Sequence, residues 1–412
     1  MYRLIVVVFF VCYFLPAHAQ EKLTSATVES KSYKLYTDKN WKELIQFGNE
    51  AVAQNFDYYY LRLRLGIAYY ELKKYRPALK QFLKAKKFNS KDDLLLEYIY
   101  YSYIFTAQFN EAKKLTHDFS SSLSQKLKTE KLSFFDFALL EAGEKNEAVS
   151  DSSVPTGYLQ PAIGFSIARS VFMFESLTIL HQAYTHNVNS QNQLYSSFNI
   201  PFAGSWSVTP AFNIVGKKSV YDKPPKGMGH PPPGPIPNDT SYSNQITSIA
   251  FKKTFSYWSL GFGSLFANFD SDKEFQRNLN FTIYPKGNNK IYFNTTLYSM
   301  GRSKSNSPEN SLSESINWNI SKKFFVSVSY LANNSKYLVE DNGSTVYYAG
   351  GHSNSLLDSK GSLFTNYVLS RHFDLYLYLA KENWEIENPP NIIKTPLTFN
   401  YNTLILGLKL KL

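Results

Sequence analysis

Cysteine is nearly absent from this sequence. Cys12 is the one cysteine among 412 residues, and it lies in an apolar stretch near the N-terminus. We therefore expect no disulfide bonds and no thiolate metal sites in the rest of the chain. Long apolar runs are also missing, since no run after residue 20 approaches the roughly 18–20 residues that a spanning helix needs. These absences exclude a disulfide scaffold and a helical membrane protein.

Motifs that carry catalysis or bind metals are missing as well. The chain has no G-x-S-x-G nucleophile elbow, no H-E-x-x-H or comparable histidine spacing, and no phosphate-binding glycine loop that opens a helix. His372 and Asp374 are read as a pair inside the lumen of a barrel rather than as half of a catalytic site. We expect no enzymatic activity, no cofactor and no metal.

Aromatic residues, by contrast, are abundant in this sequence. They make up 17% of the chain, with 31 tyrosines and 32 phenylalanines. Apolar residues reach 43% and charged residues only 19%, which is enough apolar material for buried cores. The net charge of +11 suits anionic lipids, polysaccharides or nucleic acid without choosing among them. We find no nucleic-acid-binding module and expect no nucleic acid as a partner.

Residues 1–19 have the pattern of a secretory signal peptide. Arg3 supplies the positive start, Leu4 to Leu15 form the apolar core, and Ala17 to Ala19 offer an A-x-A cleavage site. A retained anchor is the alternative, but the apolar core is short and Pro16 interrupts it. We expect a mature chain that begins at Gln20.

Residues 20–150 are predicted to be helical, because apolar positions recur at spacings of three and four. One stretch has the spacing of the tetratricopeptide repeat (TPR), in which small residues let paired helices approach and large ones fill the seams. Its residues are Leu65, Gly66, Tyr69, Tyr75, Ala78, Phe82 and Ala85. We interpret the region as a TPR α-solenoid.

The 34-residue period of the family supports this interpretation. Adding 34 to the positions of Tyr69, Tyr75 and Ala78 gives the residues of a second repeat. Subtracting 34 gives a degenerate first repeat. The residues are Tyr103, Phe109 and Ala112 in the second repeat and Leu35, Trp41 and Leu44 in the first. Residues 126–148 are predicted to be a capping helix, and a generic helical bundle remains the alternative. The resemblance implies a groove that binds a protein partner, with Arg62, Arg64, Lys73 and Lys74 as candidates for a basic lining or a solvated face.

The residue pattern changes from about residue 160. Segments of about ten residues alternate between apolar and polar side chains, which is the pattern of strands in a transmembrane barrel. In the last segment Leu404, Leu406 and Leu408 share one face, while Lys409 and Lys411 lie on the other. A soluble sandwich alternates too, so alternation alone does not decide.

Connection lengths favour the barrel. We predict twelve strands between residues 176 and 412, preceded by a linker at 151–175, with short and long connections in strict alternation. Short periplasmic turns and long extracellular loops are typical of outer-membrane β-barrels. The expected fold is therefore a TPR α-solenoid followed by an antiparallel transmembrane β-barrel of about 12 strands. Candidate lumen residues are His372, Asp374, Tyr376, Tyr378, Asn294, Tyr298, Lys409 and Lys411.

This architecture resembles the YaiO-like outer-membrane barrel family, and more distantly the exopolysaccharide export porins with longer TPR arrays. The resemblance implies an outer-membrane location with the helical region in the periplasm. Our leading hypothesis is a non-enzymatic barrel whose TPR region recruits a periplasmic or envelope protein of a surface-polymer system. The alternative is an export conduit for a saccharide or another anionic substrate, and a lipid-modifying enzyme is the third possibility.

Overall fold

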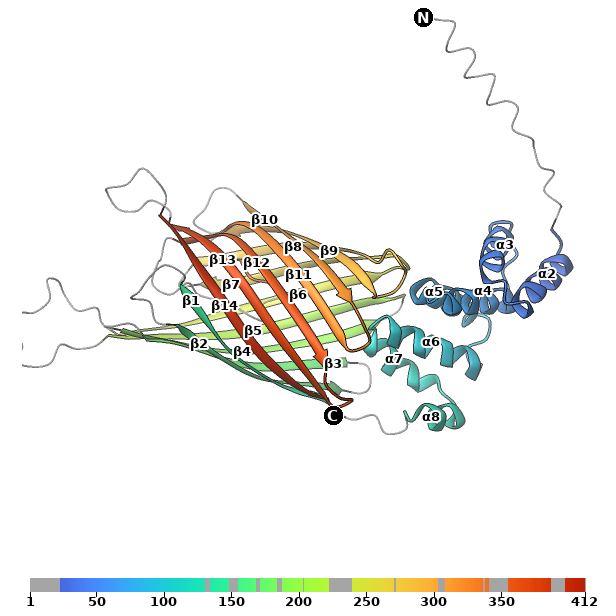
Figure 1. The fold of residues 1–412 in the computed structure, drawn as a ribbon, viewed down its shortest axis with the longest axis horizontal. Coiled ribbons are helices and arrows are strands. Elements are labelled where there is room, and N and C mark those ends of the chain that lie inside the picture. The colour runs from blue at the N-terminus through green and yellow to red at the C-terminus, as the bar shows by residue number, and fades with distance from the viewer. Residues whose placement is uncertain are drawn as a thin grey trace, which may run out of the picture.

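The chain forms a helical domain followed by a closed β-barrel in the computed structural model (Figure 1). The structure describes residues 23–129, 134–147, 155–167, 171–183, 187–202, 204–221, 239–269, 272–302, 308–335, 338–340, 355–386 and 397–411. The expected signal peptide lies outside the described residues.

The helical domain consists of short helices in antiparallel pairs. They are α2 (Ser25–Thr37), α3 (Trp41–Ala53), α4 (Tyr59–Glu71), α5 (Tyr75–Ala85), α6 (Asp93–Phe105), α7 (Phe109–Leu115) and α8 (Ser121–Leu127), with a 3-10 turn at Thr116–Asp118. Side-chain caps start three of them, since Thr24, Asp92 and Ser120 each accept a hydrogen bond from a backbone N–H of the first turn. No helix in the described parts of the chain is long and apolar enough to cross a membrane.

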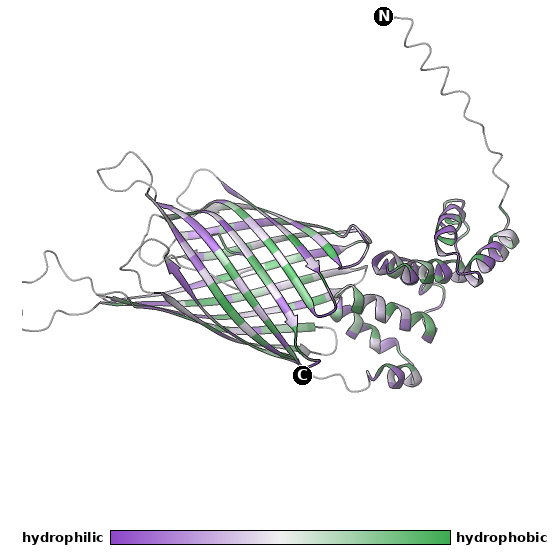
Figure 2. Ribbon diagram, in the orientation of Figure 1, coloured by the Kyte–Doolittle hydropathy of each residue, from purple (hydrophilic) through white to green (hydrophobic). Residues whose placement is uncertain are grey.

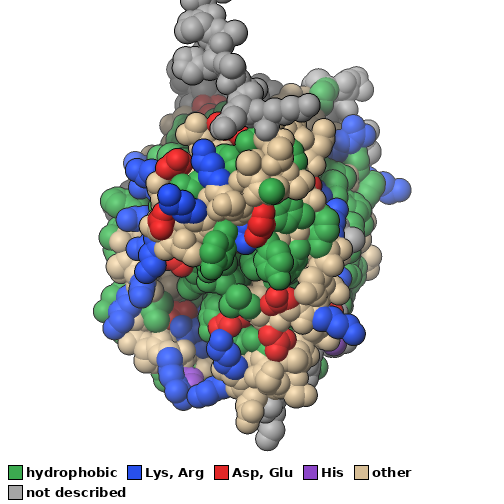
Figure 3. Space-filling view, turned by 90° about the vertical axis from the view of Figure 1, so that its right-hand side faces the viewer, with side chains coloured by type: hydrophobic (Ala, Val, Ile, Leu, Met, Phe, Trp, Pro, Cys, Tyr) green, Lys and Arg blue, Asp and Glu red, His purple; other side chains and the backbone are tan. Residues whose placement is uncertain are grey.

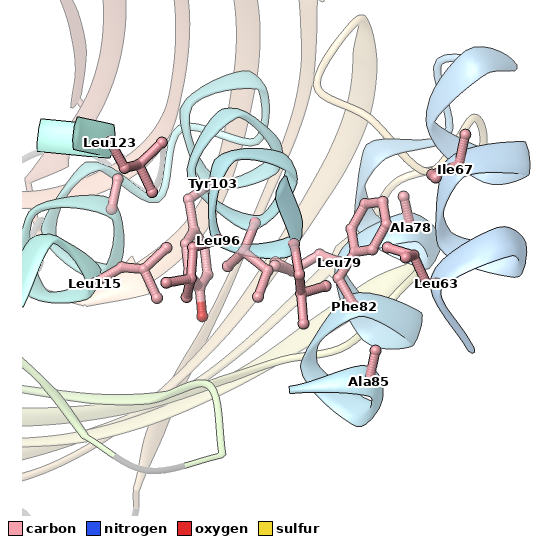
Figure 4. Packing of buried hydrophobic residues seen from close by; sticks show 13 residues of the cluster. Leu63, Ile67, Ala78, Leu79, Phe82, Ala85, Leu96, Tyr103, Leu115 and Leu123 are labelled. Carbon is pink, nitrogen blue, oxygen red and sulfur yellow. The ribbon is translucent and has the colours of Figure 1, made fainter. Parts of the chain in front are cut away.

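The core of the helical domain depends on close approach between paired helices. Gly66 of α4 faces Phe82 of α5, and a Cβ atom on Gly66 would come within 2.3 Å of the Phe82 ring. Phe82 and Ala78 are fully buried in the cluster drawn in Figure 4. The first helices of successive pairs also pack on one another, α2 on α4 and α4 on α6. The helices therefore stack in sequence rather than around one common centre.

The barrel has fourteen strands, so the prediction of twelve was wrong. The strands are β1 (Phe135–Glu147), β2 (Thr156–Ile167), β3 (Val171–Ala183), β4 (Asn187–Phe202), β5 (Trp206–Tyr221), β6 (Thr240–Thr254), β7 (Trp258–Phe269), β8 (Asp272–Ile283), β9 (Ile291–Arg302), β10 (Glu309–Asn319), β11 (Phe324–Ser335), β12 (Ser355–Val368), β13 (Phe373–Ile386) and β14 (Leu397–Lys411). Each strand pairs antiparallel with its sequence neighbours, and β1 pairs with β14 to close the ring.

The two additional strands lie where the sequence predicted a capping helix and a linker. Helix α8 ends at Leu127, where Lys128 takes a left-handed conformation with φ 55°. The predicted helix 126–148 instead contains β1, and the predicted linker 151–175 contains β2 and the start of β3. Leu139 of β1 pairs with Lys409 on one side and Ala162 on the other. Backbone pairing on both edges outweighs the helical propensity of Leu, Ala and Glu in this segment.

The two ends of the barrel differ. The helical domain and the C-terminus lie at one end, where the connections between strands have three to seven residues, as at 255–257 and 320–323 (Figure 1). The three longest connections, which join β5 to β6, β11 to β12 and β13 to β14, lie at the opposite end, together with short ones such as that between β7 and β8. Coloured by hydropathy, the strands alternate between apolar and polar residues, whereas the helical domain is mixed (Figure 2).

Candidate functional site

The strands turn apolar side chains outward and polar side chains inward. On β14, Leu404, Leu406 and Leu408 are exposed on the outer surface, while Thr403 and Ile405 are buried. The exposed large apolar residues of the other strands repeat this pattern, whereas most polar residues that are buried in the barrel face the lumen. This is the alternation that the sequence predicted, and it makes the lumen the candidate functional site.

The lumen contains a cavity of about 620 Å³. One side of this cavity, which we call the polar wall, is formed by four adjacent strands, β8 to β11, and carries only uncharged side chains. Its residues are Asn278, Asn280, Asn294, Thr296, Tyr298, Ser313, Ser315, Ser327 and Ser329. Aromatic side chains from β12 and β13 continue the lining, with Phe364 and Tyr376 packed at a centroid distance of 5.4 Å.

Hydrogen bonds hold the amides of the polar wall in place. The Asn280 Nδ2 atom donates to Asn294 Oδ1 at 2.7 Å and to Thr296 Oγ1 at 2.8 Å, and Thr282 Oγ1 donates to the same Asn294 oxygen at 3.0 Å. The wall therefore presents ordered donors and acceptors without net charge.

Several charged groups elsewhere in the lumen have ion-pair or hydrogen-bond partners, while Lys252 of β6 also lines the cavity. Lys145 Nζ lies 2.6 Å from Glu382 Oε2, to which Trp384 Nε1 also donates at 3.0 Å. Glu141 accepts hydrogen bonds from the hydroxyls of Tyr158 and Tyr376. Nearer the helical end, Lys411 pairs with Asp374 at 2.7 Å. Such pairing reduces the field that an unpaired charge would exert on a solute.

The helical domain is attached to the turn between β8 and β9. Arg76 of α5 is buried there, and its Nη2 atom donates to Asn289 Oδ1 at 2.9 Å and to Thr106 O at 3.3 Å. The guanidinium lies over the Tyr284 ring, 3.6 Å from the centroid. The backbone N–H of Arg76 donates to Gly287 O at 2.9 Å. Burial lowers the pKa of Arg76 from its ordinary value.

Helix α7 attaches the same domain to the opposite side of the mouth. Asn110 Nδ2 donates to Asn199 Oδ1 of β4 at 2.7 Å, and Lys114 Nζ donates to Pro201 O at 3.1 Å. Lys113 pairs with Asp136 of β1. The attachments run from β1 and β4 to the β8–β9 turn, so the helical domain spans this mouth. Asn199 also lines the cavity, and it links the helices to the lumen.

The candidate lumen residues fall into three groups. Asn294, Tyr298, Tyr376 and Tyr378 line the cavity. Asp374, Lys409 and Lys411 lie near the helical end, where Lys411 pairs with Asp374 and Lys409 lies over the Phe137 ring. His372 does not reach the lumen, because it lies exposed in the turn before β13 and accepts a hydrogen bond from Arg371 Nε.

The candidate TPR residues mostly lie in the helical core. Leu65, Ala78, Phe82, Ala85, Tyr103 and Ala112 are buried, and Gly66 contacts Phe82. Tyr69 accepts a hydrogen bond from Asn49 Nδ2, and the Tyr75 ring packs on Phe105. Phe109 differs, because more than half of its surface is exposed at the start of α7.

Two of the basic residues expected in the helical groove form ion pairs inside the helical domain instead. Arg62 is 2% exposed and donates to both carboxylate oxygens of Asp57 at 2.7 Å. Arg64 is likewise buried and pairs with Glu29 at 2.6 Å. Neither guanidinium is available to a partner or to solvent, so both interpretations, a basic lining and a solvated helix face, were wrong for these two residues. The carbonyl of Lys73 accepts from Asn288 of the barrel.

An aromatic surface occupies the side of the helical domain that faces away from the barrel. Figure 3 views the molecule from that end and shows apolar side chains gathered near the middle, with lysines and arginines around them. Exposed large apolar residues of the helical domain include Tyr33 of α2, Tyr60 of α4, and Leu94 and Phe105 of α6. The Arg64 guanidinium lies over both tyrosine rings, at 5.2 and 5.7 Å, so these two rings are neighbours.

Two important positions were missed by sequence reasoning. Glu141 lies in β1, which we had assigned to a helix, although Phe135, Phe137 and Leu139 alternate with Asp136 and Ala138. Arg76 looked like an ordinary helix residue, because its partner Asn289 is 213 positions away. In the described parts of the chain no three His, Cys, Asp or Glu side chains are grouped to hold a metal ion.

No protein-family model and no curated protein matches this sequence. Among solved structures, the Pseudomonas putida toluene transporter TodX is 8% identical, covers 68% of this chain and 90% of its own, and has a TM-score of 0.42. The Acinetobacter baumannii outer membrane protein Omp33 is 7% identical, with coverage of 68% and 100% and a TM-score of 0.36. A Pseudomonas aeruginosa FadL homologue is 8% identical, with coverage of 67% and 89% and a TM-score of 0.39.

Proposed function

We propose that this chain is a non-enzymatic outer-membrane β-barrel protein whose lumen passes an uncharged hydrophilic solute, with its helical domain in the periplasm. A closed barrel satisfies every ladder hydrogen bond within the sheet, as the hydrocarbon region of a membrane requires. The outward apolar residues of all the strands supply a lipid-facing surface. Long connections are typical of the extracellular end, and here the three longest lie at the end opposite the helical domain.

The polar wall is the observation that supports this function best. Asparagine amides and serine or threonine hydroxyls offer donors and acceptors that match sugar hydroxyls, and no charged side chain interrupts them across β8 to β11. The cavity of about 620 Å³ is within the range of about 300–1,000 Å³ that ligand pockets span. Of the charged residues that line this cavity, Glu340 and Lys360 pair with each other and Glu141 accepts from two tyrosines, so the long uncharged wall favours an uncharged saccharide over an anionic substrate.

Uptake into proteoliposomes tests this proposal. The full chain is reconstituted, and entry of a labelled neutral disaccharide is compared with entry of an anionic sugar acid of similar size. We expect faster entry of the neutral sugar. Asn294→Leu removes the acceptor shared by Asn280 and Thr282 and is expected to slow sugar entry several-fold. The matched control is Leu297→Ala, which changes an exposed outer residue of the same strand. Equal entry of both solutes, or no entry, would contradict the proposal.

A second role is favoured by the aromatic surface of the helical domain. We propose that α2 to α7 form a short TPR-like array, as in YaiO-like proteins, and that the surface with Tyr33 and Tyr60 binds a periplasmic protein. The stacking of first helix on first helix and the Gly66–Phe82 contact support the repeat interpretation. Tyr33 and Tyr60 are both more than half exposed and lie beside the same guanidinium, and adjoining exposed apolar groups of this kind are typical of interaction surfaces.

Cross-linking in the periplasm tests the second role. A photoreactive residue is placed at position 60, and the same residue is placed at exposed position Lys80 as the control. We expect one discrete cross-linked protein from position 60 and none from position 80. If both positions give the same products, the aromatic surface is not a specific binding site.

A further inference from the structure

A short segment between β11 and β12 lies inside the barrel. Residues 338–340, which we call the lumen segment, are described, and Val339 is only 1% exposed. Val339 belongs to an apolar cluster with Val215 of β5, Ile246 of β6, and Leu265 and Ala267 of β7. These four residues face the lumen in the half of the barrel away from the helical domain. The segment therefore leaves β11 and reaches strands far around the ring.

A glutamine side chain holds the backbone of this segment. Gln276 of β8 is 1% exposed, its Nε2 atom donates to Val339 O at 2.8 Å, and its Oε1 atom accepts from Val339 N at 3.1 Å. One amide group thus satisfies both polar groups of a buried residue, as a neighbouring strand would do. The two hydrogen bonds show that Gln276 binds the backbone of Val339 rather than only filling space beside it.

The neighbouring residue attaches the segment to the other wall. Glu340 forms an ion pair with Lys360 of β12, and both residues line the cavity. The segment is therefore fixed to β8 through Gln276 and to β12 through Lys360, while Val339 packs against β5 to β7. Since β5 and β11 are six strands apart in a ring of fourteen, the segment crosses the lumen.

We propose that Val339 and Glu340, held by Gln276 and Lys360, form the constriction that determines which solutes enter the cavity from the side opposite the helical domain. This inference rests on the proposed passage function. The constriction selects by size through the Val339 packing, and it offers an incoming ion no free counter-charge because Glu340 and Lys360 neutralise each other. Residues at the constriction, rather than those of the polar wall, then set the size limit.

Thiol labelling in intact cells tests the constriction without requiring passage through the whole protein. The chain from Gln20 onward has no cysteine, so Ser313→Cys places a single reporter on the polar wall below the segment. A bulky, charged maleimide is added outside the cells. We expect slow labelling in this background. Gln276→Ala with Lys360→Ala is expected to accelerate labelling about tenfold or more, because two hydrogen bonds and an ion pair favour the closed segment.

Lys411→Ala is the matched control, because it also removes a lumen ion pair, that with Asp374, but at the helical end of the barrel. Heat-dependent gel migration reports folding, and Lys360→Ala alone serves as a milder variant if the double variant does not fold. Fast labelling in the unmodified background, or equal acceleration by Lys411→Ala, would overturn the constriction. Disaccharide entry in the proteoliposome assay with unrestricted labelling would overturn the constriction alone. Restricted labelling without any entry would leave the constriction and reject the passage function.

Discussion

Glu111 illustrates what a single residue contributes at the junction of helices and barrel. It lies on α7, next to the attachments made by Asn110 and Lys113. Burial raises the pKa of its carboxyl above the ordinary value of 4.5, although the charges of Lys252, Arg76 and Lys114 act in the opposite direction. The folded protein therefore binds this proton more tightly than the unfolded chain does.

This shift predicts a pH dependence of stability. A carboxyl whose pKa is raised in the folded state contributes stability below its unfolded pKa, and that contribution is lost as the pH rises through the folded pKa. Glu111→Gln cannot ionise, so we expect it to raise the melting temperature of the helical domain at about pH 7 and to have little effect at about pH 4. Circular dichroism melts at both pH values measure the difference. A variant less stable than the parent at neutral pH would show that the ionised carboxylate is favourable.

At the scale of elements, the close packing of helices α4 and α5 depends on a glycine, Gly66, which has no side chain. Gly66 is mid-helix, where glycine costs about 0.5–1 kcal/mol relative to alanine. The Phe82 ring occupies the space that a Cβ atom would need. Close packing of the pair therefore outweighs the cost of glycine in the helix.

Gly66→Ala is accordingly expected to destabilise the helical domain by about 1–3 kcal/mol, the range for overpacked cores. Phe82→Leu makes room, so the double variant should lose less than the sum of the two single changes. Urea unfolding of the four proteins gives the coupling free energy. Ser30→Ala, at an exposed position of α2, is the control. Additive losses would mean that the Gly66–Phe82 contact does not set the helix spacing.

At the scale of the whole molecule, the helical domain covers one mouth of the barrel and the lumen segment crosses the lumen on the other side of the cavity. Attachments at Arg76 and at α7 reach both sides of the covered mouth. The polar cavity lies between these two closures. The proposed passage of a solute then requires movement at both ends.

Arg76→Ala is expected to loosen this junction. It removes the hydrogen bonds to Asn289 and Thr106 and the contact with Tyr284, so amide hydrogen exchange in the segment 284–290 should accelerate about tenfold. Lys80→Ala, an exposed lysine of the same helix, should leave exchange unchanged. Mass spectrometry of peptides from this segment makes the comparison. Unchanged exchange in Arg76→Ala would show that the Arg76 side chain does not hold this turn and that the backbone contacts to Gly287 and Asn288 suffice.

Local patterns determined much of this protein. Alternation along residues 404–411 and 373–379 identified barrel strands, because side chains of a strand alternate between two environments that differ in polarity. The spacing of Gly66, Ala78 and Phe82 predicted where helices approach closely, because those contacts involve residues near in sequence. Composition and the absence of motifs directed attention away from catalysis.

Tertiary structure alone decided the rest. Residues 135–147 have the composition of a helix and become β1, because closing the ring gives each edge of the strand a partner. Arg76 with Asn289, and Gln276 with Val339, are pairs separated by 213 and 63 positions. No local pattern encodes such contacts, since each depends on where the barrel brings distant residues together. The mouth, the cavity and the constriction therefore depend on how the ring folds. Most of the strands and helices that form the ring and the helical domain can be predicted from local sequence patterns.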